Sequence, residues 1–467
     1  MLCLAFGSIK ATLSKRIHTG KQRMTRPHIL LVNPWIHDFA AYDLWARPMG
    51  LLVMASWLRT VGWEPSLLDC LGPDHPDAAL RKVRPYCHGR FHRTPIPAPE
   101  PLKDISRKFC RYGLDPGIVR EDLGRVSTPA AILVTSLMTY WYPGVKETIA
   151  LVREVFPRVP VLLGGIYASL LPDHAAAHCA ADEVIEGPGE SALEAALCRH
   201  TGIRAGVNAA SPELFFKPAL DLMQRVRFLP LITSRGCPFR CAYCASARLV
   251  QRFVRRPVSA VISEIEYAVA RYGVQDVVLY DDAFLIDSRS HALPILEAVG
   301  RRFPGMRWHS PNGLHASEIT PRVATAMKSA GFETIRIGLE SSSDDFHATT
   351  GGKTNREDFI SAVRSLHDAG FTRRQIGVYL LVGLPNQTRD QIEDDVDLVL
   401  QTGASPKLAE YSPIPGTPLW PQAVSAAKIP IAQEPLLQNC TLLSAAAPGV
   451  HSFFLQTLRK RITATMG

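Results

Sequence analysis

Three cysteines fall within eight consecutive positions of this 467-residue chain. Residues 235–245 read R-G-C-P-F-R-C-A-Y-C-A, so Cys237, Cys241 and Cys244 are spaced C-x3-C-x2-C. Thiolates are the usual ligands of iron–sulfur clusters, and three thiolates on a four-iron cube leave one iron open to an external ligand. A closed zinc site needs a fourth Cys or His, but the next histidine is His291. The spacing predicts a [4Fe–4S] cluster with one open iron, and a zinc site with a distant fourth ligand is the alternative.

The other seven cysteines are scattered, unlike the dense framework of a small disulfide-bonded secreted protein. We therefore expect a reducing, cytoplasmic environment. The net charge is +9, of which residues 1–28 contribute six basic side chains and no acid, so the rest carries 9 − 6 = +3. This distribution does not favour a nucleic-acid surface. No apolar run of about 18 residues is present, so no membrane span is expected.

Two series of alternating strands and helices must position these side chains. The first covers residues 28–202 and predicts a Rossmann-like, doubly wound α/β sheet. Residues 1–27 are expected to form a basic disordered extension, and 203–228 a linker. An insertion at 71–127, rich in Pro, Arg and Lys, is expected to have little regular structure. Strands are expected at 28–33, 66–69, 131–135, 159–163 and 183–186.

The second series covers residues 229–420 and contains six strand–helix units. Six units predict a partial parallel (β/α)6 barrel, shorter than the eight-unit kind, with its chemistry at the carboxyl ends of the strands. The cysteine segment follows the first of these strands. Residues 421–467 form a C-terminal tail whose basic end is expected to be a surface helix. Strands are expected at 229–234, 277–280, 307–310, 334–339, 376–382 and 407–411.

The cysteine loop resembles that of the radical S-adenosylmethionine (SAM) superfamily, and the partial barrel resembles that family's core. The resemblance covers residues 229–420. It implies that SAM chelates the open iron, and that an electron from the cluster cleaves SAM to a 5′-deoxyadenosyl radical that takes hydrogen from substrate. It also implies a reducing partner such as flavodoxin or ferredoxin. By their places at strand ends, the resemblance implies SAM contacts from Tyr243, Asp281, Asp282, Glu340, Ser342, Gly383 and Tyr411.

One strand end departs from the family pattern. Tyr280-Asp281-Asp282 stands where the family often has a Gly-Gly-Glu run that holds the methionine amino group. A carboxylate that faces an ammonium keeps the same charge-assisted interaction. Two alternatives remain open: these acids and Glu340 could serve as helix N-terminal charges, and Tyr243 could be a core tyrosine.

The first series resembles the cobalamin (B12)-binding domain of one large radical SAM subgroup. The resemblance is carried by T-S-L-M-T-Y-W-Y-P-G at 135–144, L-G-G-I-Y-A at 163–168 and E-G-P-G-E at 186–190. All three runs follow predicted strands, at the sheet edge where doubly wound folds bind ligands. The implied cobalamin contacts are Ser136, Leu137, Tyr140, Gly164, Gly165, Gly187 and Glu190.

The D-x-H-x-x-G signature, whose histidine ligates cobalt in part of that subgroup, is absent. After the first strand the chain reads P-W-I-H-D-F-A, with His37 and Asp38 in the wrong order. Cobalamin is therefore expected to be held without a protein histidine on cobalt. The alternative is a degenerate domain that binds no cobalamin.

A cobalamin-like domain joined to a radical barrel favours a cobalamin-dependent radical SAM methyltransferase. Its expected substrate is an unactivated carbon, or phosphorus, of a small-molecule or natural-product intermediate. A non-methylating radical SAM oxidoreductase or cyclase is the first alternative, because one barrel serves many chemistries. A non-catalytic cobalamin or metal sensor is the second. No catalytic side chain is predicted.

Overall fold

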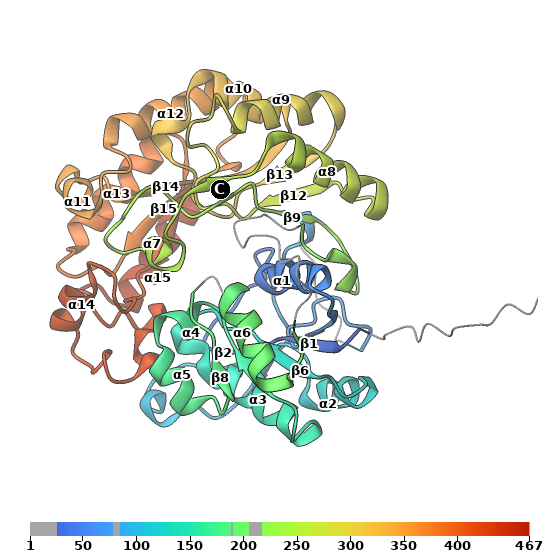
Figure 1. Ribbon diagram of the computed structural model, residues 1–467. Coiled ribbons are helices and arrows are strands. Elements are labelled where there is room, and N and C mark those ends of the chain that lie inside the picture. Colours follow the sequence, from blue (N-terminus) through green and yellow to red (C-terminus); the bar gives the residue numbers. More distant parts are fainter. Residues whose placement is uncertain (1–25, 78–84, 188–189, 205–216, 467) are drawn as a thin grey trace, which may run out of the picture.

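The computed structural model describes residues 26–77, 85–187, 190–204 and 217–466. The expected N-terminal extension lies almost wholly outside these residues. No helix in the described ranges is both long and apolar enough to cross a membrane. Figure 1 shows two sheet-centred units, with the N-terminal unit below the barrel and α1 between them.

The N-terminal unit is built on a five-stranded parallel sheet of order β3-β1-β6-β7-β8. Apolar residues fill both faces of its central strand because helices cover both sides. Helices α1 and α6 cover one face, and α2, α3 and α5 cover the other. The Rossmann-like sheet predicted from the alternation is confirmed. Its elements are β1 (His28–Asn33), α1 (Met49–Thr60), β3 (Glu64–Asp69), β6 (Ala131–Val134), α3 (Tyr142–Val155), β7 (Val161–Leu163), α4 (Ile166–Leu170), α5 (Pro172–His178), β8 (Glu183–Val184) and α6 (Glu190–Thr201).

The insertion at 71–127 contains more regular structure than predicted, and that prediction was wrong. Its strands β4 (Arg93–Pro95) and β5 (Cys110–Tyr112) form an antiparallel sheet with β2 (Ile36–Asp38). Helix α2 (Pro116–Arg125) begins where the Asp115 side chain accepts a hydrogen bond from the Gly117 amide. Strands of three residues are too short to show periodicity, so only the helix had a sequence signal, its Asp-Pro start.

The barrel is a six-stranded parallel sheet of order β16-β15-β14-β13-β12-β9, as the six-unit pattern predicted. Alternate strand residues, such as Ile335, Ile337 and Val378, are buried against the outer helices. The residues between them therefore face the interior. The elements are β9 (Leu229–Leu231), α8 (Val258–Tyr272), β12 (Asp276–Leu279), α9 (Ala292–Arg302), β13 (Arg307–His309), α10 (Pro321–Ser329), β14 (Phe332–Glu340), α11 (Asp344–Thr350), α12 (Arg356–Asp368), β15 (Ile376–Val382), α13 (Arg389–Gln401) and β16 (Ser405–Glu410).

The C-terminal tail contains helices α14 (Trp420–Ala426), whose Ala423 packs with residues of both units, and α15 (Ser452–Met466), which lies on the outside of the barrel. The apolar face of α15, including Leu455 and Leu458, joins the barrel core. Its basic face pairs with barrel acids: Arg459 donates to Glu410 at 2.5 Å. The basic amphipathic end is thus a helix packed on the barrel by its apolar face.

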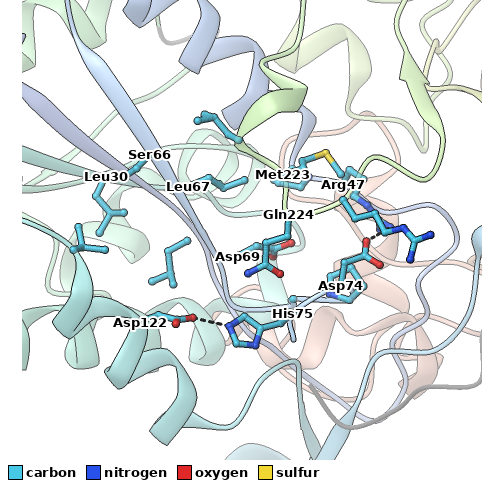
Figure 2. Close-up of a pocket in the computed structure, with 17 residues that line it drawn as sticks. Leu30, Arg47, Ser66, Leu67, Asp69, Asp74, His75, Asp122, Met223 and Gln224 are labelled. Atoms are coloured by element: carbon cyan, nitrogen blue, oxygen red, sulfur yellow. Dashed lines mark hydrogen bonds and ion pairs between the residues drawn. The ribbon is translucent and has the colours of Figure 1, made fainter. Parts of the chain in front are cut away.

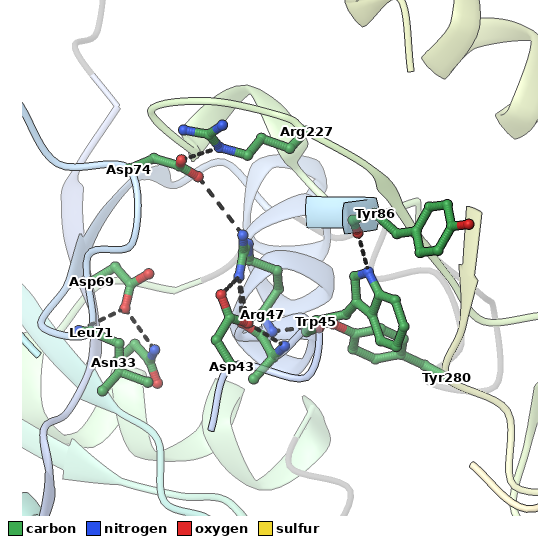
Figure 3. A network of polar contacts seen from close by, with 11 residues as sticks. Asn33, Asp43, Trp45, Arg47, Asp69, Leu71, Asp74, Tyr86, Arg227 and Tyr280 are labelled. Atoms are coloured by element: carbon green, nitrogen blue, oxygen red, sulfur yellow. Dashed lines mark hydrogen bonds and ion pairs between the residues drawn. The ribbon is translucent and has the colours of Figure 1, made fainter. Parts of the chain in front are cut away.

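A polar network joins the N-terminal unit to the barrel (Figure 3). Arg47, which precedes α1, pairs with Asp43 at 3.2 Å and with Asp74 at 3.7 Å. Asp74 also accepts a hydrogen bond from Arg227, at the entry to β9. Buried pairs of this kind are costly to break once formed, because each leaves a desolvated charge. The network therefore fixes the carboxyl edge of the N-terminal sheet against the start of the barrel.

Aromatic residues of the N-terminal unit also enter the barrel. Trp45 stacks on His309 of β13 with ring centroids 4.9 Å apart, and its carbonyl accepts a hydrogen bond from the Tyr280 hydroxyl. The Trp45 indole donates to the Tyr86 carbonyl at 2.6 Å. These contacts fill part of the barrel interior next to β12 and β13.

Candidate active site

The cysteine loop is held at both ends by neighbouring backbone. Short strands β10 (Ser234–Arg235) and β11 (Val254–Arg255) pair antiparallel across the loop's base. Gly236 lies between them with φ +76°, and a Cβ there would come within 2.7 Å of the Arg252 carbonyl oxygen. Further along, the Ala242 amide donates to the Thr350 carbonyl at 2.9 Å. The R-G-C sequence therefore has a steric reason for its glycine.

Cys237, Cys241 and Cys244 all line one cavity of about 380 Å³ at the carboxyl ends of the barrel strands. We call this the cluster cavity. Burial raises the pKa of Cys237 to about 11 and also raises that of Cys241. Such thiols stay protonated until a metal displaces the proton. His315 Nε2 lies 4.0 Å from the Cys237 sulfur. Burial lowers the pKa of His315 to about 4, so its ring is neutral near pH 7 and adds no positive charge beside that sulfur.

The donor set fits a [4Fe–4S] cluster better than a single ion. In the part of the chain that the structure describes, no group of three or more Cys, His, Asp or Glu side chains converges closely enough to hold one metal ion. In a cube each thiolate binds a different iron, so the sulfurs need not converge on one point. Three thiols around an open cavity match that requirement.

Glu340 and Lys353 form an ion pair in the wall of the cluster cavity. Glu340 ends β14 with φ +68°, a left-handed conformation that costs a residue with a side chain about 1–3 kcal/mol. The Lys353 ammonium also lies 5.8 Å from the centre of the Tyr243 ring. Burial alone would lower the pKa of Lys353, but the Glu340 carboxylate together with Cys241 and Cys244 outweighs it, so the pKa is raised. Lys353 thus places a fixed positive charge beside the cysteines.

The two acids after β12 have different surroundings. The Asp281 carboxylate accepts hydrogen bonds from the amide and hydroxyl of Thr233 and from the Ser234 hydroxyl, at 2.7–2.9 Å. It therefore ties β12 to the end of β9 and does not line the cluster cavity. Asp282 lines that cavity and accepts a hydrogen bond from Ser246 at 3.1 Å. The structure brings only Asp282 into the cavity, and its contact with SAM stays a prediction.

Three other predicted SAM contacts lie outside the cavity lining. The amide and hydroxyl of Ser342 both donate to Asp395 at 2.6 Å. Gly383 has φ +85°, and a Cβ there would meet Leu443 at 2.7 Å. Tyr411 is buried, and its hydroxyl has no hydrogen-bond partner among the described residues. An unpartnered buried hydroxyl is costly, so Tyr411 is the one of the three with an unused polar atom.

A second cavity, of about 430 Å³, lies at the carboxyl edge of the N-terminal sheet. We call it the sheet-edge cavity. Apolar side chains such as Leu133 and Leu162 line it together with Gly164, Gly165 and Gly187. Gly165 has φ +97°, and a Cβ there would lie 2.3 Å from the Ser136 carbonyl oxygen. The glycines leave bare backbone at the strand ends, which suits close approach of a large planar cofactor.

The other predicted cobalamin contacts have different positions. The Ser136 hydroxyl donates to the Gly164 carbonyl at 2.7 Å and so shapes the strand end from within. Tyr140 is buried, with its hydroxyl 3.8 Å from the Cys440 sulfur, and Leu137 is 43% exposed. Glu190 begins α6, and its side chain lies outside the described part of the structure. All seven cobalamin contacts stay predictions.

No histidine belongs to the lining of the sheet-edge cavity as described. His37 instead pairs with Glu147 at 2.7 Å, in the antiparallel sheet of the insertion. This placement agrees with the absence of the D-x-H-x-x-G signature. The absence of a histidine ligand on cobalt stays a prediction.

Asp282 lines both cavities. Arg235, Gly236 and Tyr280, which flank the cysteine loop and precede Asp282, also line the sheet-edge cavity. The carboxyl edges of the two sheets therefore face one another, and ligands in the two cavities would meet at Asp282.

A third cavity, of about 260 Å³, lies beside the edge strand β3 and is lined by many charged residues (Figure 2). Its charges are largely paired with each other: His75 contacts Asp122 at 2.9 Å, and Arg47 contacts Asp74. Neither the cysteines nor the strand-end glycines line it. Its lining comes from the N-terminal unit and from residues 222–225, ahead of β9.

Sequence reasoning missed several residues of the cluster cavity, namely Phe239, Asn312, His315, Lys353 and Tyr379. Lys353 follows the G-G pair after α11, and no spacing rule connects it to Glu340. Asn312 follows a predicted strand, so its place at a strand end could have drawn attention to it. Its side-chain amide donates to the Tyr280 and Asp281 carbonyls, at 3.1 and 3.2 Å.

Two family models match the chain. Residues 231–399 match the one described as the radical SAM superfamily, and residues 122–197 match the one described as the B12 binding domain. These matches identify the cofactors of the two domains: a [4Fe–4S] cluster and SAM for the barrel, and cobalamin for the N-terminal unit.

The curated relatives are distant. An uncharacterized methyltransferase, PH0819 of Pyrococcus horikoshii, is 24% identical over 303 residues, 58% of this chain and 65% of that protein. The anaerobic magnesium-protoporphyrin IX monomethyl ester cyclase of Cereibacter sphaeroides is 25% identical over 332 residues, 62% and 52% of the two chains. The chain thus spans between half and two thirds of the length of these relatives.

Among solved structures, the radical SAM methyltransferase TsrM from Kitasatospora setae, with cobalamin and a [4Fe–4S] cluster bound, superposes with a TM-score of 0.62. The match covers 87% of this chain and 80% of TsrM at 18% sequence identity. At that identity the likeness concerns the fold. It shows that the order and arrangement of the two units occur together in a known protein.

Proposed function

Because this chain belongs to the radical SAM superfamily and carries a B12-binding domain ahead of its radical SAM domain, we propose that it is a cobalamin-dependent radical SAM methyltransferase. The acceptor is an unactivated carbon, or phosphorus, of a small molecule. The observation that carries the proposal is the shared position of Asp282, which joins the cluster cavity to the sheet-edge cavity. A methyl donor in one cavity and a radical source in the other would meet there.

The chain's own residues bind and orient the reactants. Cys237, Cys241 and Cys244 hold the cluster, and Asp282 and the Glu340–Lys353 pair bind the charged end of SAM. When bound, the cluster and SAM supply the radical that activates the substrate, and cobalamin supplies the methyl group. Lys353 offsets negative charge from the thiolates through its fixed ammonium.

The strand-end glycines perform the corresponding task in the other cavity. Gly164, Gly165 and Gly187 expose backbone to the cofactor, and the leucines around them exclude water. A reducing partner such as flavodoxin or ferredoxin would deliver the electron, and a reducing cytoplasm is the compartment in which the thiols and the cluster persist.

An anaerobic turnover assay tests the proposal. The full chain is reconstituted with iron, sulfide and cobalamin and supplied with SAM and a strong reductant. We expect both 5′-deoxyadenosine and S-adenosylhomocysteine from the wild type. A Cys237→Ala, Cys241→Ala, Cys244→Ala variant should show no cluster absorbance and release no 5′-deoxyadenosine. A cluster-loaded wild type that releases 5′-deoxyadenosine without S-adenosylhomocysteine contradicts methyl transfer.

A non-methylating radical reaction is the second candidate. The observation that favours it is the relative named as a cyclase, whose identity to this chain is as high as that of the methyltransferase PH0819. The same assay separates the two, because this candidate gives 5′-deoxyadenosine alone. A chain that binds its cofactors and cleaves no SAM under strong reductant would instead indicate a sensor.

A further inference from the structure

Alternation along neighbouring strands decides which side chains face the barrel interior. Ile335 and Ile337 of β14 and Val378 of β15 are fully buried between the strands and the outer helices. Because successive side chains of a strand point to opposite faces, Arg336 and Tyr379 face the interior. Tyr379 also lines the cluster cavity. The wall beside the cluster therefore continues onto a partly buried arginine.

Lys407 extends this wall on the edge strand β16. It is the register partner of Tyr379, and Ala409, two residues further on the same face, lines the cluster cavity. Alternation along β16 puts Lys407 on the same face as Ala409, so its solvent-exposed ammonium points toward the barrel interior beside the cavity. The positive charge of Arg336 adds to partial desolvation in lowering the pKa of Lys407.

Arg336 lies one layer deeper than Lys407. Its register partner is Gly377, and a Cβ on that glycine would come within 2.8 Å of Arg336 Nη1. The glycine therefore leaves room for the guanidinium to lie across β15. Nη1 donates to the Ile335 carbonyl at 2.8 Å, and the Tyr379 hydroxyl is a second polar partner of the guanidinium. Further N–H groups of the five remain for a ligand. Burial lowers the pKa of Arg336.

Neither cation has a carboxylate partner among the described residues. Over the ranges that the structure describes, no ion pair joins Arg336 or Lys407 to a carboxylate, and the cavity acid Glu340 is already paired with Lys353. Like charges close together and partly removed from water repel each other and lose hydration. An anion bound between them would relieve both costs.

We propose that Arg336 and Lys407 bind an anionic group of the substrate, a carboxylate or a phosphoryl or phosphonyl group, inside the barrel beside the cluster cavity. The planar fork of an arginine and the point charge of a lysine suit the oxygens of such groups. That the anion belongs to a substrate rests on the proposed function, whereas anion binding itself depends only on the barrel residues. The residues on β14 and β16 would hold the substrate's charged end away from the reacting atom.

Calorimetric titration of the full chain with small anions tests the site directly. The probes are inorganic phosphate, methylphosphonate and acetate, with acetamide as the neutral counterpart of acetate. We expect the wild type to bind an anion and not acetamide. Whether a phosphorus probe or acetate binds with the higher affinity then identifies the anionic group of the substrate. Arg336→Gln and Lys407→Gln should each weaken binding at least tenfold, since one charge-assisted hydrogen bond accounts for about 1.5–3 kcal/mol.

Controls separate binding from folding. Arg336→Lys keeps the charge and should retain more affinity than Arg336→Gln, and Lys428→Gln, at an exposed lysine after α14, should leave binding unchanged. A wild type that binds no anion, or variants that bind as tightly as the wild type, overturn the proposal. Release of 5′-deoxyadenosine and S-adenosylhomocysteine is measured separately, so loss of methyl transfer with an intact anion site refutes the proposed function alone.

Discussion

The Glu340–Lys353 pair should be thermodynamically coupled, and a double-mutant cycle can measure the coupling. Both side chains are largely removed from solvent, with 10% and 14% exposure for Glu340 and Lys353. Breaking a buried pair by removing one partner costs about 3–5 kcal/mol, because the other charge stays desolvated and unpaired. We expect about 3 kcal/mol for Lys353→Met and for Glu340→Gln, at the low end because some exposure remains.

The double variant leaves neither charge behind. Its cost should therefore fall below the sum of the single variants by about 2 kcal/mol, within the range found for directly contacting groups. Hydrogen exchange of the amides of β14, followed by mass spectrometry, is the suitable measurement, because a chain with two sheet-centred units need not unfold in one step. Costs that add within about 0.5 kcal/mol would refute the coupling.

The pH dependence provides an internal check. The pKa of Lys353 is raised in the folded protein, so the pair's contribution is fully present below the unfolded lysine pKa of about 10.4 and is lost as pH rises through the folded value. The coupling should stay constant between about pH 6 and 9. Lys103→Met, which breaks an ion pair with Glu100 whose two side chains are 56% and 79% exposed, should have little effect on stability.

Three further predictions concern other parts of the molecule. His291 is buried and its pKa is lowered to about 4, so the folded state resists protonation and stability should fall as pH drops from about 6.5 to 4; His291→Gln should flatten the pH dependence of the urea midpoint, and an unchanged slope would contradict this. Tyr411→Phe removes an unpartnered hydroxyl and should leave the melting temperature equal or higher, whereas weaker SAM binding in the same variant would support the predicted contact. Gly165→Ala forces a conformation that costs about 1–3 kcal/mol and adds a backbone clash; it should lower both stability and cobalamin absorbance, while Gly124→Ala, in open space on α2, should lower neither.

The elements with strong local signals were predicted well. Strands with long apolar runs occur where the sequence placed them: β1 and β15 agree residue for residue with the expected spans. The helix at 389–401 begins with a capping box between Thr388 and Gln391, a signal contained in four consecutive residues. The three-residue strands of the insertion had no comparable signal, because so few residues cannot establish a period.

The strand-end acids illustrate the limit of linear reasoning. Asp281 and Asp282 are adjacent and chemically equivalent in the sequence, and both were assigned to SAM. After β12 ends, one carboxylate turns back to Thr233 and the other enters the cavities. The direction of each carboxylate depends on backbone torsions and, for Asp281, on a partner 48 residues away. The spacing of residues in the sequence reveals neither the torsions nor the partner.

The sequence by itself predicted the cluster ligands and determined the two sheets and the order of the two units. These features depend on contiguous residues: the C-x3-C-x2-C spacing, the alternation of strands and helices, and glycines next to strand ends. Only the tertiary structure decided that Asp282 joins two cavities, that Lys353 pairs with Glu340, and that Arg336 and Lys407 share one wall. Those relations arise from the packing of strands distant in the chain, where register and barrel curvature, rather than local spacing, determine which side chains meet.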